Sequence, residues 1–566
     1  MVDPRRARGH GRGRPGARHP RRPPRRGPGR GHARGPRPPG RDPRGGRSRA
    51  PHPGGARRAG EAVRVVSPSE SRRLDAEAIA SGTPGILLME RAAAAVAREV
   101  GRLARARPER AEALTVLCGA GNNGGDGFEA ARLLLEGGWP AGRLTVLFLG
   151  RQDRLPEDAA ETFRRLSARH PVIPVVDEAG LEPLRRASLV VDALFGTGLT
   201  RPLEEGSLAA RAVGAISTGR AAVVAVDVPS GLDGAVSGIP GPHVRADVTV
   251  TFGFPKAAHV RLPAAGECGR IVVAPIGLPG EEGGEGPEEG EAATAGDVAR
   301  LFPGRPAASH KGTFGTVLVV GGSTGMAGAP ALAARAAFRA GAGKVVVSAP
   351  DGVRAIVHGL CPEATTAGEA EEPDGYSALA VGPGLGRDAA AVRRFSAALG
   401  AAVPAAFDAD ALNLVGTEPE RFGSRPAPTV LTPHPGEAAR LLGVDTRAIS
   451  SDREGAAREL AKRSRAVVVL KGFRSLVAGP DGRSTVVLAG NPGMATGGTG
   501  DVLTGVVAAF LARGLGAREA AWAGAWLHGA AGDLAAERLG AESLCAGDVA
   551  EALPAAWGLL KEARLA

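Results

Sequence analysis

The sequence lacks the features that would mark a disulfide-bonded, zinc-binding or membrane-spanning protein. Its 566 residues include only four cysteines, Cys118, Cys268, Cys361 and Cys545, and no two of them form a C-x-x-C pair. This spacing argues against a disulfide framework and a cysteine zinc site, and it favours a reducing, cytoplasmic setting. No uninterrupted apolar run approaches the ~18 residues that a membrane helix needs, so we expect no membrane span.

Lysine is also scarce, with six Lys against 65 Arg, a bias typical of GC-rich coding sequence. The net charge of +12 comes from residues 1–62, which hold 19 Arg and three acidic residues, whereas residues 63–566 hold 52 basic and 56 acidic residues. Residues 1–62 contain 12 Pro and 14 Gly but no Leu, Ile or Phe, which predicts a disordered tail. Three interpretations of this tail stay open: a spurious extension upstream of a start at Val63 or Val65, an inert linker, or a basic nucleic-acid arm. The last is the least favoured, since no aromatic residue is present for base stacking.

Alternating strand and helix patterns divide the remainder into two α/β domains. In the first half, strand-like runs at 114–118, 143–150, 189–196, 222–229 and 247–253 alternate with helical patterns at 125–138, 156–169 and 204–218. A Glu- and Gly-rich stretch interrupts the alternation, which resumes and ends in a mostly helical segment, 498–560. We therefore predict a first domain at 63–278, an acidic linker at 279–293 and a second domain at 294–566. The continuous apolar strands predict parallel sheets covered on both faces.

Three strand ends in the first half carry polar residues beside glycine turns. They are GAGNNGGDG (119–127), DALFGTG (192–198) and DVPSG (227–231). Because the carboxyl ends of parallel strands meet at one edge of a sheet, these residues should line one crevice. The first motif also satisfies G-x-G-x-x-G, but the next strand ends in Gly150 and Arg151 instead of the acid typical of a dehydrogenase. Amide and carboxylate oxygens suit a hard cation or a sugar-phosphate.

These three motifs resemble the NAD(P)H-hydrate epimerase family, a Rossmann-like domain, over 63–278. The resemblance implies a K⁺ ion held by Asn123, Asp192 and Ser230, and we take Asp227 as the candidate acid/base. It further implies that the hydrated nicotinamide nucleotide is bound by Asn122, Asn123, Gly124, Gly125, Asp126, Gly196, Thr197, Gly198, Leu199, Thr200, Arg201, Pro202 and Asp227.

The second half carries the strongest motif, NPGMATGGTGD (491–501), directly before an apolar helical pattern. Free N–H groups at such a helix start form an anion hole for a transferring phosphoryl group. Asp501, at the helix entrance, is the candidate general base for a substrate hydroxyl. No G-x-x-x-x-G-K-[ST] sequence is present, which excludes a P-loop enzyme.

Together with SHKGTFG (309–315), GPGLG (382–386) and TPHPGE (432–437), this motif resembles the ribokinase-like ADP/ATP-dependent NAD(P)H-hydrate dehydratases over 294–566. The resemblance implies that the hydrated nucleotide is contacted by Ala329, Gly386, His434 and Asp501. It implies that the adenine nucleotide is contacted by Lys471, Gly472, Phe473, Arg474, Ser475 and Gly500, with Ser475 standing where the family usually has threonine. Mg²⁺ on the nucleotide phosphates follows from the phosphoryl-transfer chemistry.

As a whole the chain resembles the bifunctional NAD(P)H-hydrate repair enzymes. The predicted activity is epimerisation of the R and S forms of hydrated NADH and NADPH, followed by dehydration of the S form at the expense of ADP or ATP. We expect a cytoplasmic homo-oligomer without a membrane or nucleic-acid partner. Two alternatives stay open: a ribokinase-like vitamin-precursor kinase fused to a nucleotide-binding domain, and a non-catalytic RNA-associated scaffold. The presence of Asn123, Asp192 and Asp227 argues against the scaffold.

Overall fold

The computed structural model describes residues 62–106, 108–199, 201–281 and 290–565. The predicted disordered tail, apart from Ala62, and most of the predicted acidic linker lie outside these residues. Within the described part of the chain, no helix is both long and apolar enough to cross a membrane.

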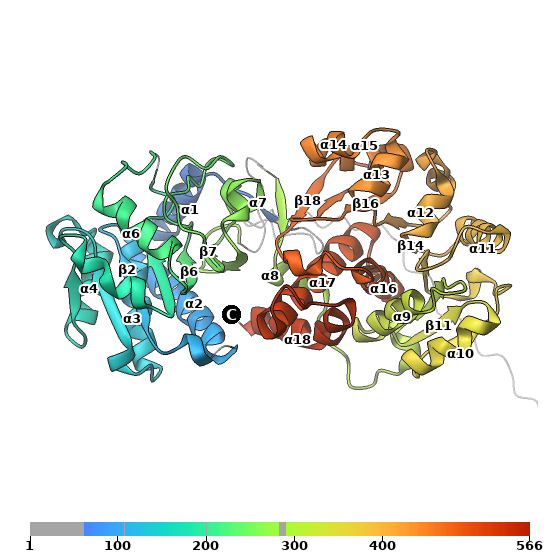
Figure 1. The fold of residues 1–566 in the computed structure, drawn as a ribbon, viewed down its shortest axis with the longest axis horizontal. Coiled ribbons are helices and arrows are strands. Elements are labelled where there is room, and N and C mark those ends of the chain that lie inside the picture. Colours follow the sequence, from blue (N-terminus) through green and yellow to red (C-terminus); the bar gives the residue numbers. More distant parts are fainter. Residues whose placement is uncertain (1–61, 107, 200, 282–289, 566) are drawn as a thin grey trace, which may run out of the picture. The chain divides into compact units, whose positions relative to one another are not determined.

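The first half folds around a seven-stranded sheet in which all neighbouring strands are parallel (Figure 1). Its strands, in spatial order, are β4 (Val172–Pro174), β3 (Leu144–Phe148), β2 (Leu114–Cys118), β5 (Leu189–Ala193), β6 (Ala222–Val226), β7 (Val248–Phe252) and β8 (Arg270–Ala274). The strand order reverses between β2 and β5, and such a reversal opens a crevice at the carboxyl ends of the strands. The motifs at 119–127 and 192–198 both lie at this point.

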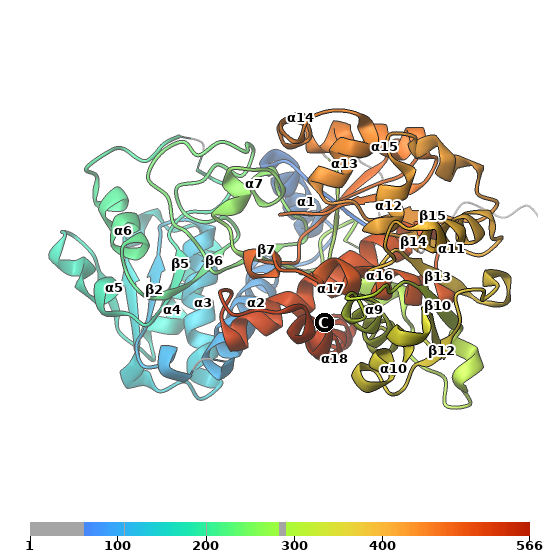
Figure 2. The ribbon, with the colours of Figure 1, turned by 45° about the vertical axis from the view of Figure 1, so that its right-hand side comes forward.

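Helices cover both faces of the first sheet, as the continuous apolar strands predict. The helices of this half are α1 (Pro68–Ala80), α2 (Gly85–Ala106), α3 (Asn122–Glu136), α4 (Glu157–Ser167), α5 (Glu182–Arg186), α6 (Leu208–Ser217) and α7 (Ala257–Val260). Helices α2, α3 and α4 lie on one face of the sheet and α5 and α6 on the other (Figure 2). A separate cluster of buried side chains joins each group of helices to the sheet. Helix α3 begins at Asn122, so most of the GAGNNGGDG motif is already helical.

The second half folds around an eleven-stranded sheet. In spatial order it contains β1 (Val63–Arg64), β9 (Glu291–Ala293), β18 (Ser484–Val487), β17 (Leu476–Ala478), β16 (Val467–Leu470), β15 (Thr429–Leu431), β14 (Ala405–Phe407), β13 (Ala378–Val381), β10 (Thr316–Val320), β11 (Lys344–Ser348) and β12 (Thr365–Ala367). The strands from β12 to β16 are parallel, and β17 is antiparallel to both of its neighbours. The strand order reverses between β10 and β13.

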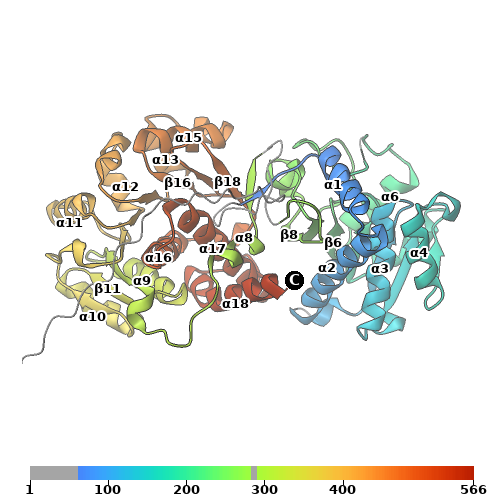
Figure 3. The ribbon, with the colours of Figure 1, turned by 180° about the vertical axis from the view of Figure 1, so that it is seen from behind.

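The helices of the second half also form two layers (Figure 3). One face carries α8 (Ala295–Leu301), α9 (Gly328–Arg339), α10 (Asp351–Leu360), α16 (Thr499–Ala512), α17 (Ala517–Leu539) and α18 (Ala546–Leu565). The other face carries α11 (Ala389–Gly400), α12 (Asp410–Val415), α13 (Pro435–Leu442), α14 (Thr446–Ser451) and α15 (Arg453–Ser464). The predicted two-domain α/β class is therefore confirmed.

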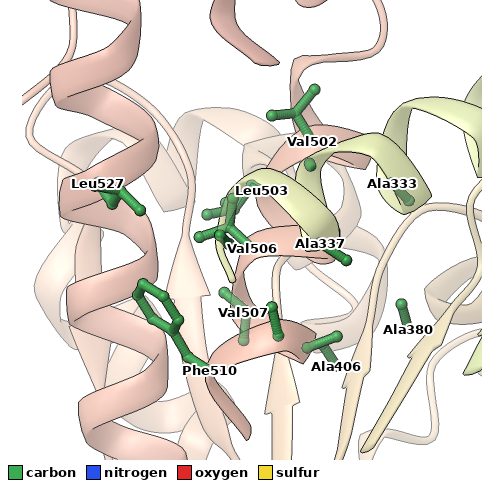
Figure 4. Close-up of a cluster of buried hydrophobic side chains, with 14 of the residues drawn as sticks. Ala333, Ala337, Ala380, Ala406, Val502, Leu503, Val506, Val507, Phe510 and Leu527 are labelled. Carbon is green, nitrogen blue, oxygen red and sulfur yellow. The ribbon is translucent and has the colours of Figure 1, made fainter. Parts of the chain in front are cut away.

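Helix α16 is buried continuously from Val502 to Leu511, because α9, α17 and the sheet surround it (Figure 4). Its contact with α9 is close enough that a Cβ atom at Gly505 would clash with the backbone carbonyl of Ala333. This packing fixes the helix whose first turn carries the GGTGD motif.

The second sheet begins earlier in the chain than the composition indicates. Glu291–Ala293, inside the predicted linker, form β9, and β1 pairs with it in antiparallel fashion. The Glu291 carboxylate accepts hydrogen bonds from Arg483 (2.5 Å) and Arg518 (2.6 Å). These charge-assisted bonds offset the free-energy cost of burying Glu291. From composition alone we expected this glutamate in a solvent-exposed linker.

Candidate active sites

The first site is a cavity of about 560 Å³ at the carboxyl ends of β2, β5 and β6, with α1 contributing to its wall. The predicted residues that line it are Asn122, Asn123, Asp126, Gly196, Thr197, Gly198, Leu199 and Asp227. Gly124 and Gly125 belong to α3 and do not line the cavity. A Cβ atom at Gly124 would clash with the Gly119 carbonyl, and one at Gly125 would meet the Met89 side chain. Arg201 and Pro202 are not among the lining residues, and Thr200 lies outside the described residues.

Asp227 is the best-defined group in this cavity. It follows β6 directly, with a left-handed backbone (φ 63°) that is uncommon for a residue other than glycine. Its Oδ1 accepts hydrogen bonds from Lys256 Nζ (2.8 Å) and Thr251 Oγ1 (2.9 Å), while Oδ2 accepts one from the Thr197 N–H (3.3 Å). Burial alone would raise the pKa of Asp227, but the Lys256 ammonium outweighs burial and holds the pKa below its usual range. Asp227 is therefore an ionised carboxylate.

Of the other carboxyl groups that line the same cavity, Asp126 and Asp75 behave in the opposite way. Burial, reinforced by the charge of Asp227, raises the pKa of Asp126 well above its usual range. Burial also raises the pKa of Asp75, on α1, although Lys256 opposes the shift. A site that holds one carboxylate and carboxyl groups with raised pKa values can both accept and donate protons. Neither Asp75 nor Lys256 was predicted from the motifs, although Lys256 is one of only six lysines.

Beside this cavity, Asp192 and Ser230 form a buried cluster of oxygen atoms. The two Asp192 oxygens accept hydrogen bonds from Ser230 Oγ (2.6 Å) and the Ser230 N–H (2.8 Å). Burial raises the pKa of Asp192 to about 6, and no Lys or Arg of the described residues pairs with it. The third predicted ligand, Asn123, points its Oδ1 at Gly196, and its buried Nδ2 has no hydrogen-bond partner in the part of the chain that the structure describes.

The second site surrounds the first turn of α16. Gly498, in a left-handed conformation (φ 92°), precedes the helix, and Asp501 lies in its first turn. Burial and the charge of the neighbouring Asp408 together raise the pKa of Asp501 to about 7, although Lys471 opposes both effects. Lys471 Nζ itself donates to Asp408 Oδ1 (2.6 Å).

Asp408 and Glu437 complete the charged cluster, and neither was predicted from the motifs. Asp408 Oδ2 accepts a hydrogen bond from Thr504 Oγ1 (3.0 Å) on α16. Glu437 lies 3.8 Å from Lys471 Nζ, and burial raises its pKa to about 7 although Lys471 opposes the shift. Asp408 directly follows β14, so it lies at the carboxyl end of a strand, as Asp227 does.

A cavity of about 500 Å³ opens beside this cluster. It is lined by all six predicted nucleotide residues, Lys471, Gly472, Phe473, Arg474, Ser475 and Gly500. The guanidinium of Arg474 donates to the Leu488 carbonyl (2.6 Å), and the Ser475 hydroxyl donates to the Gly472 carbonyl (3.0 Å). These internal bonds shape the loop that forms one wall of the cavity.

The four predicted substrate residues of this half come from four separate parts of the chain. His434 caps α13, where its Nδ1 accepts hydrogen bonds from the Gly436 and Glu437 N–H groups (3.0 and 3.3 Å), and it also lines the 500 Å³ cavity. The N–H of Gly386 (φ 82°) donates to Asp410 Oδ2 (3.0 Å), and Ala329 lies in the first turn of α9. Asp501 lies close to Lys471, whereas among the described residues no hydrogen bond or ion pair joins Ala329 or Gly386 to either of them.

Comparisons with known proteins match both halves separately. The family model described as YjeF-related protein N-terminus matches residues 86–258, and the one described as NAD(P)H-hydrate dehydratase matches residues 317–555. The bifunctional NAD(P)H-hydrate repair enzyme Nnr of Moorella thermoacetica is 39% identical over 495 residues, which cover 83% of this chain and 92% of that protein. The protein of the same name from Escherichia coli K12 is 35% identical over 446 residues, covering 77% and 83% of the two chains. The crystal structure of the Bacillus subtilis ADP/ATP-dependent NAD(P)H-hydrate dehydratase, co-crystallized with ATP/Mg²⁺, is 34% identical with a TM-score of 0.45, covering 47% of this chain and 97% of that one.

Proposed function

The chain belongs to the family of bifunctional NAD(P)H-hydrate repair enzymes, and from this premise we propose how its two sites divide the work. The first cavity interconverts the R and S forms of hydrated NADH or NADPH. The second phosphorylates the S form with ADP or ATP and eliminates phosphate, which regenerates the reduced nucleotide. The observation that carries the assignment is Asp501, a carboxylate with a pKa near 7 in the first turn of α16, beside Lys471 and a nucleotide-sized cavity.

In the first cavity, the ring nitrogen of the hydrate can expel the C6 hydroxyl, and water can then return to the other face. The departing hydroxide needs a proton, and the returning water must lose one. Asp227 Oδ1 accepts hydrogen bonds from Thr251 and Lys256. Oδ2, which faces Gly196, accepts the longer bond from the Thr197 N–H (3.3 Å), so Oδ2 is the oxygen that we propose exchanges protons with the substrate. Asp126, whose raised pKa favours the neutral form, is the proposed proton donor.

We propose that Asn123, Asp192 and Ser230 hold K⁺ next to this cavity. The donor set fits, because it consists of hard oxygens with a single carboxylate and contains neither sulfur nor imidazole. Asp192 is buried and has no Lys or Arg partner among the described residues. Its pKa stays raised although Ser230 and Leu194 donate hydrogen bonds to it, so a bound cation would further stabilise the carboxylate. Ser230 Oγ also accepts from the Phe195 N–H (2.9 Å), so the same oxygens tie the 195–199 loop to β5.

In the second site, Asp501 takes the proton from the C6 hydroxyl as the hydroxyl oxygen attacks the terminal phosphorus of the nucleotide. The P–O bond to the rest of the nucleotide breaks, and ADP leaves from ATP or AMP from ADP. The N–H groups at the start of α16 stabilise the negative charge on the transferred phosphoryl group. The C6–O bond then breaks as the ring nitrogen expels phosphate, and the ring carbon next to C6 loses a proton to restore the double bond. Bound Mg²⁺ would offset the charge of the nucleotide phosphates, and the Asp408 and Glu437 carboxylates fit such a hard cation.

We place both reactions in the cytoplasm, where NAD(P)H and the adenine nucleotides occur together, and we retain the expectation of a homo-oligomer. Sedimentation analysis tests the expected homo-oligomer.

The function itself is tested by supplying the R hydrate alone, with or without ADP or ATP. Recovery of dihydronicotinamide absorbance that requires both an intact first site and the nucleotide supports the proposal, whereas recovery without nucleotide contradicts it.

A further inference from the structure

Behind Asp227 lies a buried histidine that no motif singled out. His259, on the four-residue helix α7, is fully buried in the first domain. Its Nδ1 lies 3.0 Å from the backbone nitrogen of Lys256, and its Nε2 lies 2.9 Å from the carbonyl oxygen of Asp227. The imidazole therefore bridges the two residues whose side chains form the central ion pair of the cavity.

The two partners determine where the imidazole proton lies. A backbone N–H can only donate and a backbone carbonyl can only accept, so Nδ1 must be the acceptor and Nε2 must carry the hydrogen. A doubly protonated ring would place a second N–H against the Lys256 N–H. In agreement, burial lowers the pKa of His259 to about 3, and the neighbouring Lys256 charge acts in the same direction.

The carbonyl that His259 holds belongs to a residue in an unusual conformation. Asp227 has a φ of 63°, and its N–H donates to the Val250 carbonyl on the neighbouring strand (2.7 Å). The backbone of Asp227 is thus fixed on both sides, at its N–H by β7 and at its carbonyl by the His259 ring. Strained conformations of this kind persist only when the surroundings determine them fully.

We infer that His259 is a positioning residue for epimerisation: its neutral Nε2–H tautomer holds the Asp227 backbone in the left-handed conformation that directs Oδ2 toward the substrate. The inference rests on the proposed role of the first cavity. Without the imidazole, Asp227 can relax toward an ordinary strand conformation, and its carboxylate would leave the place defined by Thr251 and Lys256.

Kinetic comparison of the full chain with His259→Phe, His259→Gln and the control His243→Phe tests this role. His243 lies in the same domain and also contacts a backbone carbonyl (Gly241, 2.9 Å), but it does not line the cavity. We expect His259→Phe to lower kcat for epimerisation by about 100-fold at nearly constant KM, and His259→Gln, which keeps a donor for Asp227, to regain about tenfold of that loss. His243→Phe should leave epimerisation unchanged, and dehydration of the S hydrate should be unchanged in all three.

An independent readout is the imidazole tautomer, observed by ¹⁵N NMR with His259 assigned by its absence in His259→Gln. We expect a neutral ring with the hydrogen on Nε2 at about pH 5, where an ordinary histidine is protonated. A protonated ring, an Nδ1–H tautomer, or wild-type kcat in His259→Phe would each overturn the inference. Absence of epimerisation in the wild type would instead refute the proposed function, and the NMR result would still report on the His259 geometry.

Discussion

Replacement of Asp501 by asparagine tests whether dehydration and epimerisation use separate sites, because it changes only one carboxylate oxygen to an amide nitrogen. The substitution keeps the size and shape of the side chain in the first turn of α16 but removes the carboxylate that is proposed to accept the substrate proton. A positioned general base contributes about 10²–10⁴-fold to rate, so Asp501→Asn should lower kcat for dehydration by that factor. Epimerisation should be unchanged, because the first site has its own carboxylates.

The pH dependence of the wild type follows from the environment of Asp501. Burial, with the Asp408 charge, raises its pKa to about 7, and a base must be ionised to act. The dehydration rate should therefore rise through about pH 7, roughly three units above the ordinary range of an aspartate. Asp408→Asn removes one of the charges that raise this pKa, so the rise should move to lower pH.

The raised pKa of Asp501 also predicts that the folded chain becomes less stable as pH rises, whereas dehydration becomes faster. A carboxyl group whose pKa is higher in the folded than in the unfolded chain binds more protons when folded, so the chain loses stability as pH rises from about 4 to about 7. Asp501→Asn lacks this loss and should be more stable than the wild type at pH 8, by about 2 kcal/mol after allowance for solvent screening, with little difference at pH 4.

Separate assays of the two half-reactions and thermal denaturation at the two pH values check these results. In Asp501→Asn the dehydration rate should fall while stability at pH 8 rises, a combination expected when a catalytic group destabilises the fold. If Asp501→Asn keeps its dehydration rate, or if it loses epimerisation as well, Asp501 is not the base of an independent second site.

Three further predictions concern other parts of the chain. Asp192→Ala should weaken hydrate binding and abolish the response of epimerisation to K⁺; equal wild-type rates in K⁺ and in a bulky organic-cation buffer would refute the ion site. Deletion of residues 1–61 should leave both rates and Tm unchanged, whereas deletion of 1–64 also removes β1 and should lower Tm; equal Tm values for the two deletions would contradict the pairing with β9. Gly505→Ala should destabilise the second domain by about 1–3 kcal/mol, since its Cβ would meet the Ala333 carbonyl; an unchanged denaturation midpoint would show that α16 can shift to accommodate it.

The long, β-branched strands were predictable from sequence because burial on both faces leaves an uninterrupted apolar run. The run at 114–118 is β2 to the residue, and that at 222–229 contains β6. The three-residue strands β4 and β14 gave no such signal: β4 is an edge strand with Ile173 exposed, and β14 begins with two alanines. Because β14 was missed, Asp408 at its end was missed with it.

The sites were predictable where a motif combines glycine turns with a strand end, as for Asp192 and Asp227. Lys256 and His259 were not, because they lie on and beside a short helix after β7 and meet Asp227 only through the parallel pairing of β6 with β7. The scarcity of lysine did not single out Lys256, because four of the six lysines, Lys311, Lys344, Lys462 and Lys561, are exposed at the surface.

The central claim, that one chain carries an epimerase site and a separate nucleotide-dependent dehydratase site, is tested most directly by the extent of recovery from a mixture of R and S hydrates. With ADP or ATP, the wild type should restore the dihydronicotinamide absorbance of the whole mixture, and Asp227→Asn should restore only the S fraction rapidly. Complete and equally fast recovery by Asp227→Asn, or restoration of only the S fraction by the wild type, would contradict the two-site account.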